Sequence, residues 1–117
     1  MDPRFLLRLG PSIVMITFGI NQFYQPQNWL QYVPSWAPQV LRMAPETIMR
    51  IHSVVNVLLG LWLLSGVQPN IAAWLSLLWF LSILPFAFMS DWTIGVRDTA
   101  LTIGIFALIT LLRYTTR

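Results

Sequence analysis

Apolar residues gather in four long stretches along the chain, separated by short polar segments. The stretches cover about residues 5–24, 46–65, 70–89 and 95–113, each close to the roughly 20 residues that a helix needs to cross a bilayer. Runs such as Val54–Leu59 lack the period-two alternation of a membrane-spanning strand. The pattern therefore predicts an all-α integral membrane protein, a bundle of four transmembrane helices forming a single domain over residues 1–117.

The connection between the first two stretches, about residues 25–45, differs in kind from the other two. It holds four of the eight prolines, together with Trp29, Tyr32 and Trp36. Prolines disfavour a continuous helix, and amphipathic aromatic residues are enriched where a membrane meets water. We predict that this Pro/Trp-rich segment, called the flap below, lies across the mouth of the bundle at the interface. A plain loop anchored by its aromatic residues is the alternative.

Composition supports the membrane interpretation. The chain is 56% hydrophobic and 9% charged, whereas soluble domains carry about 25% charged residues. Its seven basic residues are all arginines, and the net charge of +3 is spread along the chain. Nucleic-acid binding needs clustered basic residues, so nucleic acid is not an expected partner. The absence of cysteine excludes disulfides, thiolate metal sites and a CxxC redox pair.

Four spans place both termini on the same side of the membrane. The termini side carries one more arginine than the opposite side, which favours cytoplasmic termini in a multi-pass protein of the cell (inner or plasma) membrane. The arginines on the termini side are Arg4, Arg8, Arg113 and Arg117, and those on the other side are Arg42, Arg50 and Arg97.

Polar and ionisable residues gather at the end of the bundle that carries the flap. Such groups are costly inside a membrane and usually face the bundle interior or a watery cavity, so we predict a polar pocket beneath the flap. The residues that helix direction brings to this end are Asn21, Gln22, Glu46, Arg50, His52, Asn56, Asp91, Arg97 and Asp98.

Some of these residues have a structural interpretation as ion pairs. Glu46 and Arg50 are four residues apart and can pair on one helix face. Arg97 points about 100° away from Asp98 around a helix, so these two need not pair. Arg97 can anchor to Glu46 or Asp91, or it can hold an anionic headgroup or substrate. Asp98 lies in the first turn of its helix, where a negative charge complements the helix dipole.

The ligand-binding interpretation rests on side chains that could reach a quinone or lipid. His52 either bonds to a neighbouring helix or serves as a ligand contact, and Asn56 lies deep enough to need a hydrogen-bonding partner. One histidine cannot form a metal or haem site alone. We therefore assign no catalytic residue, no metal site and no cofactor held by the chain's own residues. The candidate ligand-binding residues are Asn21, Trp29, Trp36, His52, Asn56, Arg97 and Asp98.

Small residues indicate where helices approach closely. Ser53 and Gly60 would admit another helix against the second span, and the strip of Arg97, Ala100, Gly104 and Ala107 should face another helix.

The order and spacing of several short motifs resemble the DoxX-like family of small four-helix membrane proteins over nearly the whole chain. Gln22 departs from that pattern, because the family often has a lysine near this position. The resemblance implies a four-helix membrane bundle associated with redox systems, in which members serve as membrane subunits of thiosulfate:quinone oxidoreductase or as partners of other membrane oxidoreductases. The matching motifs are Arg8–Gly10, Phe18–Phe23, Trp29–Pro34 with Trp36 and Pro38, Asn56–Leu61 with Gly66, and Val96–Leu101.

Three functions compete at this point. The leading hypothesis is a non-catalytic accessory subunit of a larger membrane electron-transfer complex, with other oxidoreductase subunits and lipids as partners and a quinone possible in the pocket. The alternative is a stand-alone carrier or channel for a small solute, acting as a homo-oligomer. The apolar segments Leu58–Leu64 and Ile71–Leu78 argue against a polar path through the bilayer. The third is an enzyme that acts on a lipid or quinone through His52, Glu46 or Asp98.

Overall fold

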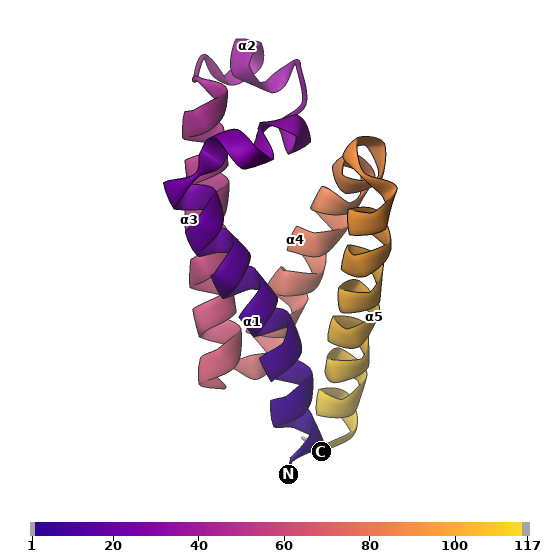
Figure 1. Cartoon of the computed structure of the whole chain (residues 1–117). Coiled ribbons are helices and arrows are strands. Elements are labelled where there is room, and N and C mark those ends of the chain that lie inside the picture. The colour runs from indigo at the N-terminus through magenta and orange to yellow at the C-terminus, as the bar shows by residue number, and fades with distance from the viewer. Residues whose placement is uncertain (1, 116–117) are drawn as a thin grey trace.

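The computed structural model describes residues 2–115 and shows a bundle of long helices (Figure 1). Four of them are long and apolar enough to cross a membrane, which confirms the predicted multi-pass membrane fold. No strand occurs among the described residues. Each long helix begins and ends within three residues of the predicted bounds. The elements are α1 (Pro3–Tyr24), η1 (Pro26–Tyr32), α2 (Ala37–Leu41), α3 (Pro45–Ser65), α4 (Pro69–Ser90) and α5 (Trp92–Thr115).

Proline and glycine set several of these helix ends. Pro3, Pro45 and Pro69 each occupy the first position of a helix, where a missing N–H costs nothing and the fixed φ suits the helix. Gly66 ends α3 with φ of 77°, a left-handed conformation that favours glycine. The side chain of Asp2 caps α1 by accepting a hydrogen bond from the Arg4 backbone N–H at 2.9 Å.

The long helices pack as two pairs, α1 against α3 and α4 against α5, which separate towards the flap end (Figure 1). Close approach within the first pair depends on two glycines. A Cβ at Gly19 would lie 2.6 Å from Val57 Cγ2, and one at Gly60 would lie 2.8 Å from Ile16 Cγ1. The predicted close contact at Gly60 is therefore confirmed, and its partner is α1.

Apart from its arginine, the predicted strip on α5 does not pack against another helix of the described chain. A Cβ at Gly104 would meet no atom within 4 Å, and Ala100 and Ala107 are exposed. The buried positions of α5, including Ile105 and Leu108, fall on a different face of the helix. Small size alone did not identify the packed face, because larger apolar side chains fill the space between α5 and its neighbours.

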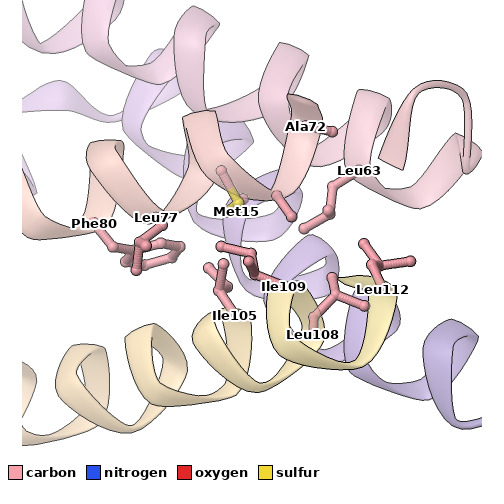
Figure 2. Packing of buried hydrophobic residues seen from close by; sticks show 10 residues of the cluster. Met15, Leu63, Ala72, Leu77, Phe80, Ile105, Leu108, Ile109 and Leu112 are labelled. Atoms are coloured by element: carbon pink, nitrogen blue, oxygen red, sulfur yellow. The ribbon is translucent and has the colours of Figure 1, made fainter. Parts of the chain in front are cut away.

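The apolar core occupies the half of the bundle nearer the termini. Met15 from α1 meets residues of the other three long helices there (Figure 2). Leu63 and Ala72 flank the turn between α3 and α4, and Leu112 lies near the end of α5. Apolar side chains therefore fill this half of the bundle, and this cluster does not extend to the flap end.

The flap folds into two short helices, η1 and α2, across the end of the bundle opposite the termini (Figure 1). As predicted from its prolines, it contains no continuous helix. The hydroxyl of Ser90, at the end of α4, donates to the Gln31 carbonyl at 2.8 Å. The Trp29 indole N–H donates to Asn21 Oδ1 at 2.7 Å. These bonds hold η1 to both helix pairs.

Candidate functional site

A cavity of about 310 Å³ lies beneath the flap, between the two helix pairs. Its walls come from η1 and from all four long helices, and most of its lining is aliphatic or aromatic. Pockets of roughly 300–1,000 Å³ with a few convergent polar groups are typical of small-molecule sites. In such sites the few polar groups fix the orientation and the specificity of the ligand, so they are described next.

One polar group of the cavity is a buried hydrogen-bonded chain across three helices. The Asn56 side-chain amide donates to Gln22 Oε1 at 3.1 Å. The Trp79 indole N–H donates to Asn56 Oδ1 at 2.9 Å. Asn56 therefore has the partner that its depth required, and this chain ties α1, α3 and α4 together beside the cavity. These two bonds occupy Gln22 Oε1, Asn56 Oδ1 and the Trp79 indole N–H, so these atoms serve to build the cavity wall.

His52 lies one helical turn before Asn56 on α3 and also lines the cavity. Its imidazole stacks on the Trp79 ring, with ring centroids 4.7 Å apart and planes tilted by 28°. Within residues 2–115 no hydrogen bond to the imidazole occurs. His52 therefore contacts the neighbouring helix α4 through a ring stack and not through the predicted hydrogen bond. Both imidazole nitrogens are left without a hydrogen-bond partner in the described chain, so they are available to a ligand.

Arg97 and Asp98 form an ion pair at the cavity. Asp98 Oδ1 accepts bonds from Arg97 Nε at 3.1 Å and from Arg97 Nη2 at 3.0 Å. The Asp98 side chain is 7% exposed and that of Arg97 is 35% exposed. The guanidinium carbon lies 4.7 Å from the centre of the Phe18 ring, a cation–π contact. The N–H groups on Nη1 have no partner among the described residues.

This pairing corrects the expectation that Arg97 anchors to Glu46 or Asp91. The Cα–Cβ directions of adjacent helical residues diverge, but the long arginine stem bends back and reaches the neighbouring carboxylate. An enclosed carboxylate requires a positive partner, and Arg97 is the one within reach.

The other predicted ion pair is also absent, because the ion pairs among residues 2–115 are Arg97–Asp98 and Arg4–Asp2. Arg50 donates from Nε to the Phe23 carbonyl at 3.2 Å. It therefore binds the end of α1 and does not pair with Glu46. Asp91 Oδ1 accepts from the Thr93 hydroxyl at 2.6 Å and from the Thr93 N–H at 3.0 Å. These bonds lower the pKa of Asp91. Asp91 thus supports the start of α5.

Aromatic residues form the wall under the flap. The Trp29 ring meets Phe18 edge-on with centroids 5.5 Å apart, and its centroid is 5.7 Å from that of Tyr32. All three residues line the cavity. The flap and α1 therefore contribute aromatic faces, while polar side chains reach the cavity from all four long helices.

Five of the seven candidate ligand-binding residues line the cavity, namely Trp29, His52, Asn56, Arg97 and Asp98. Asn21 does not line it and instead holds Trp29 in place. Trp36 is 54% exposed on the outside of the flap. The positions of the aromatic residues in the sequence did not show that Trp36 lies outside the cavity lining.

Sequence reasoning missed Trp79 as part of the site. An indole N–H within a membrane span needs an acceptor, and that requirement was the available signal. Gln22 was placed at this end of the bundle but not among the ligand contacts, and it lines the cavity. In the part of the chain that the structure describes, no three His, Asp or Glu side chains lie close enough to hold a metal ion.

Comparison with protein families decides the kinship of this chain. The DoxX family model matches residues 4–89. The chain belongs to the DoxX family. The match covers α1, the flap, α3 and α4, and thus four of the five elements that line the cavity. Arg97 and Asp98, on α5, lie beyond the matched residues. Searches of curated proteins and of solved structures gave no match.

Proposed function

We propose that this DoxX-family protein is a non-catalytic accessory subunit of a larger membrane redox complex, and that it holds a quinone or a lipid in the cavity beneath the flap. The observation that carries the proposal is the cavity itself, an apolar space closed by aromatic rings and edged by His52 and Arg97. Ligand sites commonly combine a mainly apolar lining with a few placed polar groups.

The polar atoms at the cavity match an amphiphilic ligand. Arg97 keeps N–H donors beyond those given to Asp98, and the His52 imidazole adds a donor or an acceptor according to its tautomer. A ring carbonyl or an ester carbonyl accepts such bonds. A hydrocarbon tail matches the aliphatic and aromatic remainder of the lining.

The proposed accessory role is supported by the outward faces of the long helices, which are available for contact with other membrane subunits. About three quarters of its residues lie in four apolar helices, whose outward faces carry large side chains such as Leu58, Ile103 and Phe106. Such faces suit lipid and other membrane helices. The family resemblance to partners of membrane oxidoreductases supplies the redox context. Cytoplasmic termini in the cell membrane belong to the same proposal.

The carrier alternative has less support from the packing. A solute path has to continue through the bundle, but the cluster around Met15, Leu63 and Leu108 fills the half nearer the termini. The polar lining is confined to the flap end. Flux of a solute through purified protein in liposomes would favour a carrier over an accessory subunit.

The test is extraction from native membranes in a mild detergent, followed by native gels and mass spectrometry of both proteins and extracted small molecules. We expect reproducible co-migration with cofactor-bearing oxidoreductase subunits, and a quinone or lipid retained with the complex. A matched preparation of the Gly19→Leu variant, whose side chain would clash with α3 and should push α1 away from it, is expected to lose the small molecule. Migration of the intact protein as a small species without redox subunits would contradict the accessory role.

A further inference from the structure

We infer that the cavity selects an uncharged ring that carries a hydrogen-bond acceptor, and that it rejects anionic headgroups. This inference rests on the proposed function, because it names the class of molecule that the same cavity takes. Three observations carry it: the internal neutralisation of Arg97, the ring stack at His52, and the aromatic walls.

The first observation is the charge balance of the cavity. The ionisable side chains that line it are His52, Arg97, Asp98 and the phenol of Tyr32. Asp98 takes two hydrogen bonds from Arg97 and so neutralises its charge. No carboxylate of the described chain contacts His52, so no acidic partner stabilises a positive charge on its imidazole. The cavity therefore presents donors without a net positive charge.

An anion would meet a specific penalty here. To gain the charge of Arg97 it must approach a carboxylate whose side chain is 7% exposed, so Asp98 has little water to stabilise it if its partner is taken. Two negative groups sharing one guanidinium in an apolar setting repel each other strongly. A neutral acceptor avoids this repulsion, because it can use the guanidinium N–H groups that Asp98 leaves free.

The second and third observations concern shape. The stacked rings of His52 and Trp79 both line the cavity, and Phe18, Trp29 and Tyr32 form aromatic contacts along another wall. Flat walls of this kind suit a planar ring better than a tetrahedral phosphate. The His52 imidazole, which has no hydrogen-bond partner in the described chain, lines this space, where a ring substituent can bond to it.

The experiment compares two probes on purified protein in an uncharged detergent: a benzoquinone with a ten-carbon tail and a short-chain phosphatidylglycerol. Binding is measured by calorimetric titration for the parent chain and for Asp98→Asn. This variant keeps the size of the side chain and an oxygen that can accept from Arg97, but it leaves the guanidinium charge unbalanced. Thermal melting verifies that the variant stays folded.

We expect the parent chain to bind the benzoquinone and to bind the phosphatidylglycerol at least tenfold more weakly. In Asp98→Asn the affinity for phosphatidylglycerol should rise by about tenfold or more, while that for the benzoquinone changes much less. His52→Phe should weaken benzoquinone binding by about tenfold, and His52→Gln should restore part of it. Ile51→Phe, on the outward face of the same helix, is the matched control and should change nothing.

Equal or tighter binding of phosphatidylglycerol by the parent chain, unaffected by Asp98→Asn, would overturn the inference while leaving a lipid-binding cavity in place. Binding of neither probe by a folded parent chain would overturn both the inference and the ligand part of the proposed function. Loss of benzoquinone affinity in Ile51→Phe equal to that in His52→Phe would also overturn it, because the ring would then lie outside the cavity.

Discussion

At the scale of single residues, two features hold the helices together. Gly19 and Gly60 allow α1 and α3 to approach closely, and the buried Asn56 amide hydrogen-bonds to α1 and α4. The close approach at Gly60 was predicted from the sequence, whereas that at Gly19 was not. The depth of Asn56 along its helix showed that it needs a partner, but not that Gln22 and Trp79 supply it. The partner of Arg97 was missed, because residue spacing describes backbone directions and not the path of a long side chain.

Gly19 offers a sharp test of helix packing. Its missing Cβ is what allows Val57 Cγ2 and the Ser53 carbonyl to lie against α1. We expect Gly19→Ala to lower the free energy of unfolding by about 1–3 kcal/mol through overpacking, as measured by denaturant titration in detergent micelles. Gly104→Ala is the matched control, since its Cβ meets open space. Equal effects at the two positions would contradict the packing.

Asn56 offers a test of the buried hydrogen-bonded chain. Asn56→Leu removes the partners of Gln22 Oε1 and of the Trp79 indole N–H together. An unsatisfied buried polar group costs about 1–3 kcal/mol, so the unfolding free energy should fall by about that amount. Val54→Leu, on the lipid-facing side of α3, should be close to neutral. A neutral Asn56→Leu would show that the chain of bonds contributes nothing.

At the scale of elements, the sequence was most informative about the long helices. Apolar length sets where they run, and proline at the first position together with Gly66 sets several of their ends. The flap was less predictable. Its prolines excluded a continuous helix, but the turn that sends Trp29 inwards and Trp36 outwards depends on tertiary bonds from Asn21 and Ser90.

The anchoring of the flap leads to a prediction about its dynamics. Asn21→Ala removes the acceptor for the Trp29 indole N–H, and a single such bond contributes about 0.5–1.5 kcal/mol. We expect faster amide hydrogen exchange within Pro26–Tyr32, measured by mass spectrometry, while the long helices keep their protection. Gln27→Ala, at an exposed position of η1, is the control. Unchanged exchange in Asn21→Ala would show that the flap is held by other contacts.

At the scale of the whole molecule, helix direction predicted the essential arrangement, because four spans bring the polar residues to one end. Helix direction did not predict that the two helix pairs separate at the flap end and leave the cavity between them (Figure 1). That separation follows from unequal packing. Glycines draw α1 onto α3, whereas the apolar cluster joins the pairs only near the termini.

The orientation in the membrane is testable because the chain has no cysteine. Ser35→Cys places a thiol on the flap, and Asn70→Cys places one near the α3–α4 turn, both at exposed positions. With cytoplasmic termini, a membrane-impermeant maleimide should label Ser35→Cys in intact cells and label Asn70→Cys only after permeabilisation. The reverse pattern would place the termini and the α3–α4 turn on the outer side.

The central claim is that a ligand occupies the space between the helix pairs beneath the flap. The most direct measurement is photolabelling of the purified protein with a photoreactive benzoquinone, followed by peptide mapping. We predict labelling concentrated on α3 around His52 and on α5 around Arg97, suppressed by excess unlabelled benzoquinone. Labelling spread over outward-facing positions such as Leu58 and Phe106, with no suppression by the competitor, would contradict the claim.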